Sequence, residues 1–126
     1  MKIKHKYGLL LADITLTFNE KSKVIENMVV DTGAARTLIS QDAVEDIDLQ
    51  VDLHDKIVTY FGIGGKEHAF RKQVDQIQID DLIVEKIEVD FNDFGYDDIN
   101  GLLGLDLLMR AEFTIDLRQL RMDRNF

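Results

Sequence analysis

Short stretches in which apolar and polar residues alternate recur along most of this 126-residue chain. A two-residue period places the apolar side chains on one face of an extended backbone, so the pattern favours half-buried β-strands over helices. Residues 14–18 and 24–30 form the clearest pair, and the polar turn between them at residues 19–23 predicts a hairpin. Further strands are predicted over residues 8–12, 56–61, 68–74, 77–79, 82–91, 113–117 and 120–122.

Two short helical segments are expected between these strands. Ser40 is a typical N-cap residue for a helical turn over residues 41–45, and the apolar segment over residues 105–110 predicts a second short helix. The chain has no proline, and neither a low-complexity tract nor an internal repeat divides it. We therefore expect one mainly β domain over residues 1–126, long enough to bury a core without disulfide bonds.

The formal net charge of −9 makes duplex nucleic acid and anionic membrane surfaces poor partners. The apolar stretch over residues 8–12 is too short for an export signal or a membrane span and is read as a strand instead. The sequence has no cysteine, which excludes disulfides and thiolate metal ligands, and a cytoplasmic location is expected. His5, His54 and His68 share no metal-ligand spacing, so we expect no metal and no cofactor.

One aliphatic run, residues 28–30, ends abruptly on the triplet Asp31, Thr32 and Gly33. A strand that ends in this way places a carboxylate at the edge of the core, a setting typical of functional carboxylates. Thr32 supplies a hydroxyl and Gly33 permits close backbone approach, so hydrogen bonds can hold the carboxylate. Taken alone, the triplet is better explained as a turn in which the carboxylate caps backbone amides.

Two further features follow the triplet in chain order. The first is a predicted hairpin with a glycine-rich tip over residues 60–65, and the second is an apolar, glycine-punctuated segment over residues 99–108 that runs into a helix. An ordinary hairpin turn explains the first almost as well as a functional role, and core packing explains the leucines of the second. It is the order of the three features that points to a function.

Together the three features resemble the retropepsin-like aspartic proteases, in particular their single-domain bacterial members. The resemblance covers residues 8–122 and is strongest over residues 29–40, 101–108 and 113–117. It implies a retropepsin-like closed β-barrel with a glycine-tipped flap hairpin, and a homodimer whose active site lies on the two-fold axis. The chain departs from the retroviral members at Leu105, where those enzymes carry an arginine that braces the active-site loop and the dimer.

The resemblance also implies a role for each matching residue. Asp31 is the expected catalytic residue, and its expected supports are Thr32, Gly33, Ala34 and Thr37. The expected flap, which would also bind substrate, comprises Tyr60, Phe61, Gly62, Ile63, Gly64 and Gly65. The residues expected to support the active-site loop from beneath are Gly101, Leu102, Leu103, Gly104 and Asp106.

Peptide hydrolysis without a metal or a covalent nucleophile needs an activated water and a proton donor. Two carboxylates that share one proton supply both. Because the sequence contains one Asp-Thr-Gly triplet, the second Asp31 must come from a second chain. We therefore expect an aspartic endopeptidase that acts on polypeptides as a homodimer. The alternatives are a catalytically inactive peptide-binding or dimerisation module, and a monomer that dimerises only on a substrate or partner.

Two other site types fit the sequence poorly. The acidic stretch over residues 90–95 resembles a calcium loop only in part, because Phe94 and Gly101 stand at its fifth and twelfth positions, where oxygen ligands belong. Thr37 and Ser40 have no nearby histidine in the sequence to act as a base, so a serine-type mechanism is not supported.

Overall fold

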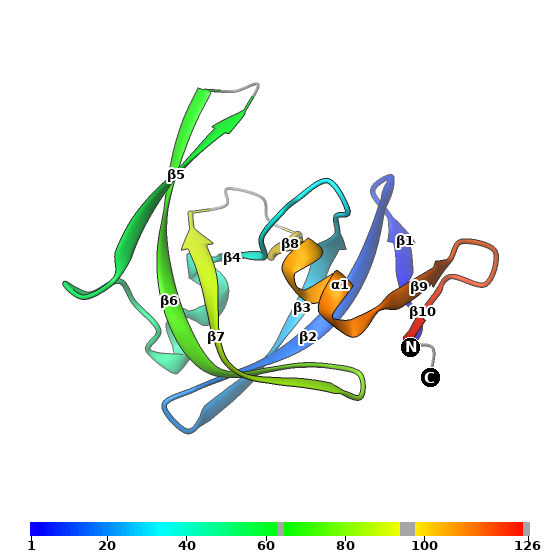
Figure 1. The fold of residues 1–126 in the computed structure, drawn as a ribbon, viewed down its shortest axis with the longest axis horizontal. Helices are drawn as coiled ribbons and strands as arrows, with labels where there is room; N and C mark the ends of the chain where they lie inside the picture. The colour runs from blue at the N-terminus through cyan, green and yellow to red at the C-terminus, as the bar shows by residue number, and fades with distance from the viewer. Residues whose placement is uncertain (63–64, 94–97, 125–126) are drawn as a thin grey trace.

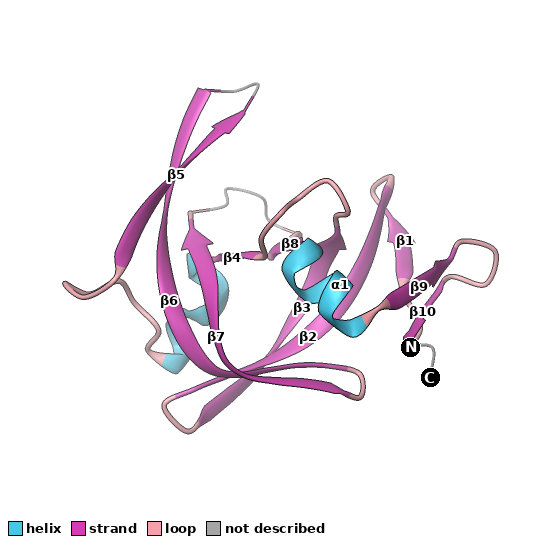
Figure 2. Ribbon diagram, in the orientation of Figure 1, coloured by secondary structure: helices cyan, strands magenta, loops and turns pink. Residues whose placement is uncertain are grey.

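The computed structural model describes residues 1–62, 65–93 and 98–124. This part of the chain is mainly β with two short helices, as the alternation predicted (Figure 2). The helices are a 3-10 helix (Gln41–Ile47) and α1 (Leu105–Ala111). The strands are β1 (Lys4–Lys6), β2 (Leu9–Phe18), β3 (Lys21–Val30), β4 (Leu38–Ser40), β5 (Lys56–Gly62), β6 (Gly65–Ile79), β7 (Leu82–Asn92), β8 (Gly101–Leu103), β9 (Phe113–Asp116) and β10 (Arg121–Arg124).

The main sheet closes on itself. Its strands follow the order β1-β2-β3-β8-β4-β7-β6-β5, and an additional pairing between β2 and β6 completes a ring (Figure 1). This ring is the observed form of the expected barrel, and β5 projects from it as the outer strand of a hairpin with β6. Buried aliphatic side chains fill the core, and Phe70 stacks on Phe91 with ring centroids 5.3 Å apart.

The hairpin between β2 and β3 is tighter than the sequence predicted. The turn consists of Asn19 and Glu20, which both have positive φ, and Phe18 pairs directly with Lys21. Such a two-residue turn matches the right-handed twist of the paired strands. The polar residues 21–23, which we assigned to the turn, therefore belong to β3.

Strand β6 is continuous, whereas the sequence predicted separate strands over residues 68–74 and 77–79. Its backbone pairs with β5 near one end and with β2 near the other, and with β7 over most of its length. These ladders hold the backbone extended through the polar residues Asp75 and Gln76, where local alternation fails.

Strands β4 and β8 were not predicted as strands, because three residues are too few to show a period. Their pairing defines the centre of the fold: β3 runs parallel to β8, β4 runs parallel to β7, and β4 and β8 are antiparallel. The loop that joins β3 to β4 therefore emerges from the middle of the sheet.

Both predicted helices are present. The first extends over Gln41–Ile47, with Ser40 at the N-cap position, but the Ser40 side chain makes no capping hydrogen bond. The predicted position of the N-cap is therefore confirmed, but the expected capping hydrogen bond from the Ser40 hydroxyl is absent. Ser40 is the last residue of β4, and its backbone amide donates to Asn100 O over 2.8 Å.

The two ends of the chain pair with each other. Ile3 N donates to Leu120 O and Met122 N donates to Met1 O, both over 3.0 Å. Strand β10 pairs with β9 on its other side, so the N-terminal segment, β10 and β9 lie side by side within one chain (Figure 1). The sequence did not allow this arrangement to be predicted.

Candidate active site

Strand β3 delivers Asp31 to the centre of the fold. Val30 pairs with Leu103 of the parallel strand β8, and Asp31 N then donates to Leu103 O over 3.0 Å. Leu103 is fully buried and Leu102 is half-buried. The predicted support beneath the loop is thus a strand that runs alongside the strand carrying Asp31.

The loop after Asp31 folds back on its carboxylate. Gly33 N donates to Asp31 Oδ1 over 2.9 Å, and Ala34 N donates to Asp31 O over 3.2 Å. A Cβ on Gly33 would lie 3.2 Å from Asp31 Oδ1, so glycine suits this approach. Asp31 is half-buried, and within the described residues its Oδ2 has no hydrogen-bond partner. Thr32 is exposed at the tip of the turn.

A buried hydroxyl ties this loop to α1. Thr37 is fully buried; its Oγ1 donates to Asp106 Oδ1 over 2.7 Å, and its backbone N donates to Asp106 Oδ2 over 3.1 Å. The same hydroxyl oxygen accepts from Gly104 N over 3.1 Å. Asp106 Oδ1 also accepts from Leu107 N, which holds the carboxylate at the first turn of the helix.

Two glycines allow the backbones to approach closely. A Cβ on Gly104 would lie 2.6 Å from Arg36 C, and a Cβ on Gly101 would lie 2.1 Å from Leu38 O. Both atoms belong to the segment that follows Asp31, so any side chain at these two positions would push that segment away.

The glycine-tipped hairpin lies where the resemblance implied. Strands β5 and β6 pair in register from Lys56 and Arg71 to Gly62 and Gly65. Of the expected flap residues, Ile63 and Gly64 lie outside the described residues. Within the same hairpin, the backbone of Phe61 pairs with Lys66.

Comparison with known proteins decides the family. The sequence model of the aspartyl protease family matches residues 14–107, a range that contains the Asp31 loop, the hairpin and the Gly104–Asp106 segment. This chain belongs to the aspartyl protease family. No curated protein sequence matches it at a significant level.

The fold of this aspartyl protease family member is retropepsin-like. Its structure is similar to the crystal structure of a retropepsin-like aspartic protease from Rickettsia conorii, with a TM-score of 0.67 and 20% sequence identity. The similarity covers 91% of this chain and 82% of that one.

A pocket of about 300 Å³ lies between the Asp31 loop and the hairpin of this family member. The loop contributes residues 33–36, and Tyr60 and Glu67 contribute from the paired hairpin strands. Leu38 and Leu102 complete the lining, so most of the exposed lining atoms are apolar. The structure brings the expected active-site loop and the expected flap residue Tyr60 to one cavity.

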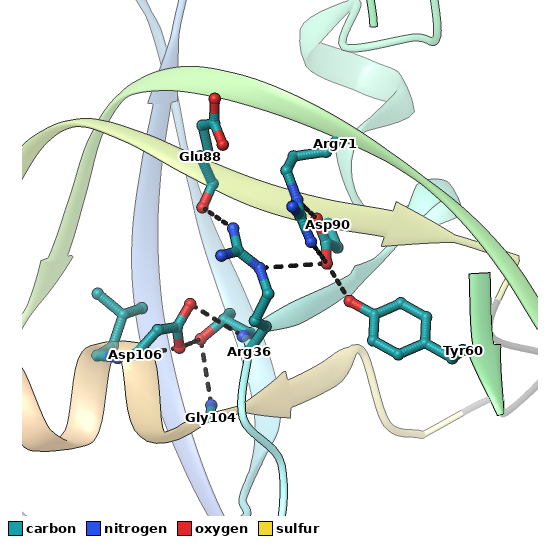
Figure 3. A network of polar contacts seen from close by, with 9 residues as sticks. Arg36, Tyr60, Arg71, Glu88, Asp90, Gly104 and Asp106 are labelled. Carbon is teal, nitrogen blue, oxygen red and sulfur yellow. Dashed lines mark hydrogen bonds and ion pairs between the residues drawn. The ribbon is translucent and has the colours of Figure 1, made fainter. Parts of the chain in front are cut away.

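Sequence reasoning missed three charged residues in the lining of this pocket or next to it. Arg36, Arg71 and Asp90 meet behind the loop, together with the Tyr60 hydroxyl (Figure 3). Asp90 is fully buried although it stands in the acidic stretch that we compared with a calcium loop. The available signal was its position between the apolar residues Val89 and Phe91 in a predicted strand.

Among the described residues, no group of three His, Cys, Asp or Glu side chains is placed to bind a metal ion. Over the same residues, no helix combines the length and apolar character needed to cross a bilayer.

Proposed function

We propose that this chain is an aspartic endopeptidase that works as a homodimer, in which two Asp31 carboxylates activate a water molecule. The observation that carries the proposal is the loop around Asp31. Gly33 holds one carboxylate oxygen, and the other is left available to a water or a shared proton. Thr37 and Asp106 brace this loop from behind.

The chemistry follows from the approach of like charges. Two carboxylates about 3 Å apart cannot both ionise, so the pair holds one proton and titrates as a unit. The ionised partner takes a proton from the attacking water, and the protonated partner donates to the carbonyl oxygen of the scissile peptide bond. Each chain supplies one carboxylate, so dimerisation assembles the catalytic pair.

The surface around Thr32 suits a second copy of this chain. An apolar hollow of about 340 Å³ lies beside Thr32, and Leu105, Met109 and Phe113 contribute to its lining. Met109 is 68% exposed in the single chain. An apolar surface next to an incomplete active site supports burial against a partner that completes it. Leu105, which replaces the arginine of retroviral members, contributes apolar area to this surface.

The pocket between the Asp31 loop and the hairpin supports a polypeptide substrate. Its apolar lining from Leu38 and Leu102 would receive an apolar side chain next to the scissile bond. The hairpin strands β5 and β6 would cover the bound segment and exclude water.

The test compares wild type with Asp31→Asn on an unstructured protein substrate between about pH 4 and pH 7. Asp42→Asn is the matched control, because Asp42 is an exposed carboxylate on the short helix with no partner among the described residues. We expect wild type and Asp42→Asn to cleave and Asp31→Asn to fold but not cleave. A dimeric wild type that binds unfolded peptides and cleaves none across this range would support the inactive peptide-binding module instead.

A further inference from the structure

Asp90 occupies a central position among the strands around the proposed substrate pocket. It lies on β7, which runs between β4 and β6 in the sheet. On one side it is in register with Leu38, just after the Asp31 loop, and on the other it is in register with Arg71. Its side chain is fully buried, so its charge has to be balanced by protein groups.

The groups that contact Asp90 come from the Asp31 loop and from both strands of the hairpin (Figure 3). Arg71, on hairpin strand β6, donates from Nε to Oδ1 over 2.7 Å and from Nη2 to Oδ2 over 3.2 Å. Tyr60, on hairpin strand β5, donates its hydroxyl to Oδ2. Arg36, on the Asp31 loop, places Nε 3.4 Å from the same oxygen.

The charges make Asp90 the link between these groups. Arg36 and Arg71 are both cations, so they repel each other unless an anion lies between them. Arg36 is held loosely: besides the ion pair, its Nη2 donates to the backbone O of Glu88 over 3.4 Å. Burial and the neighbouring carboxylate raise the pKa of Tyr60 to about 12, so its hydroxyl stays a donor. Without the carboxylate, the loop and the hairpin would lose their shared partner.

We propose that Asp90 is a positioning residue that fixes the hairpin of β5 and β6 relative to the Asp31 loop and thereby sets the width of the substrate pocket. The inference rests on the proposed function for its catalytic consequence, although the coupling itself is structural. Asp90 is absent from the pocket lining and acts through Arg36 and Tyr60, which line it on opposite walls. In the proposed enzyme the hairpin would contact the substrate both in the bound complex and in the transition state. A loosened hairpin would therefore weaken the binding of the two about equally and act mainly on KM.

The variant that tests this is Asp90→Asn, which preserves shape and removes the charge. Glu88→Gln is the matched control: Glu88 is exposed on the same strand and meets Arg36 through its backbone O, which the substitution keeps. We expect Asp90→Asn to raise KM about tenfold with a smaller change in kcat, as loss of uniform binding predicts. Glu88→Gln should match wild type.

A second readout does not depend on catalysis. In Asp90→Asn, amide hydrogen exchange should accelerate over residues 56–62 and 65–71 but not over residues 9–18 of β2. In the same variant, the pKa of Tyr60 should fall from about 12 toward the ordinary tyrosine value of 10. The signal of Tyr60 is identified as the titration that is lost in Tyr60→Phe. One outcome is that wild type cleaves nothing while amide exchange in the hairpin is still faster in Asp90→Asn. In that case the proposed function fails, but the coupling of the hairpin to the Asp31 loop through Asp90 stands.

If Asp90→Asn fails to fold, Tyr60→Phe takes its place, and hairpin exchange is then the deciding readout because Tyr60 itself lines the pocket. Tyr60→Phe removes a single donor to Asp90. It should raise KM and the rate of amide exchange in the hairpin, each by less than Asp90→Asn would. The proposal is overturned if a folded Asp90→Asn, or Tyr60→Phe in its place, matches Glu88→Gln in both KM and hairpin exchange. A fall in thermal stability with KM and exchange unchanged would likewise assign Asp90 a purely structural role.

Discussion

The hydroxyl of Thr37 lies 2.7 Å from Asp106 Oδ1, and this hydrogen bond joins the loop that carries Asp31 to the first turn of α1. The same oxygen accepts from the buried Gly104 N, so one side chain serves both as donor and as acceptor. The position of the proposed catalytic loop therefore depends on a hydroxyl that is itself closed to solvent.

Replacing Thr37 by valine tests this dependence. Thr37→Val keeps the shape but leaves Gly104 N buried without an acceptor, which should lower the free energy of unfolding by about 2 kcal/mol. Thr37→Ser retains the hydroxyl and should lose less than half of that amount. Urea unfolding of the three proteins measures the difference, and equal midpoints for serine and valine would show that the hydroxyl contributes nothing.

Gly104 should not tolerate even a methyl group. Its φ of −94° is open to any residue, so Gly104→Ala acts through the contact of a Cβ with Arg36 C at 2.6 Å and Arg36 O at 2.7 Å. These are backbone atoms of the Asp31 loop, and we expect a loss of about 1–3 kcal/mol in stability together with reduced cleavage. Thermal unfolding and a cleavage assay check both effects. An unchanged melting temperature would mean that the Asp31 loop moves away from the added methyl group without any loss of stability.

The predicted strands and helices were largely right where a periodic pattern was long enough to read. Strands β2, β3, β5 and β7 and helix α1 follow from local alternation or from an apolar segment. The short strands β4 and β8 could not be predicted in this way, because long-range parallel pairing rather than local sequence makes them strands.

Some residues of the candidate site could likewise be predicted from local sequence, whereas others could not. Asp31, Thr37 and Asp106 were recognisable because they stand in motifs with a characteristic order. Arg36 and Asp90 were not, because they are 54 positions apart in the sequence and meet only after β4 pairs with β7. A buried ion pair leaves little local signal beyond one charged residue inside an apolar strand.

Acid should weaken the cluster of charges around Asp123 on β10, which the Met1 α-amino group contacts from the other end of the chain. Asp123 accepts from Arg121 Nε and Nη2, both over 3.0 Å, and Arg121 followed by the Met1 α-amino group lowers the pKa of Asp123 to about 2. A lowered folded-state pKa contributes stability above the unfolded value of 3.8, and this contribution is lost as the pH falls from about 4 to 2.

Asp123→Asn should therefore be less stable than wild type at pH 7, and the two should converge near pH 2. Urea midpoints measured across this range give the comparison. A difference that persists unchanged at about pH 2 would contradict the ionic origin of the contribution.

The apolar surface beside Thr32 predicts which substitution separates the proposed dimer. Met109→Glu places a charge on the proposed interface and should raise the dimer dissociation constant at least about tenfold. Leu53→Glu adds the same charge at a fully exposed position outside that surface and should leave the constant unchanged. Sedimentation equilibrium measures both. Equal dissociation constants for the two variants would place the interface elsewhere.

Loss of the dimer by Met109→Glu should also be visible in catalysis. Activity per chain should fall at low protein concentration and recover as the concentration rises, because the substitution leaves Asp31 and the substrate pocket intact. Activity per chain that stays low at concentrations where the variant is dimeric would show that Met109 acts on the site directly.

The most direct test of the central claim is cleavage by mixed dimers. Wild-type chain at a fixed amount is allowed to exchange subunits with increasing Asp31→Asn, at concentrations where all chains are dimeric. If both Asp31 carboxylates are required, activity per wild-type chain should fall to about half at a one-to-one ratio and to about a tenth at nine-to-one, from random pairing. Activity per wild-type chain that stays constant across these ratios would show that each chain works alone, and would contradict the paired Asp31 mechanism.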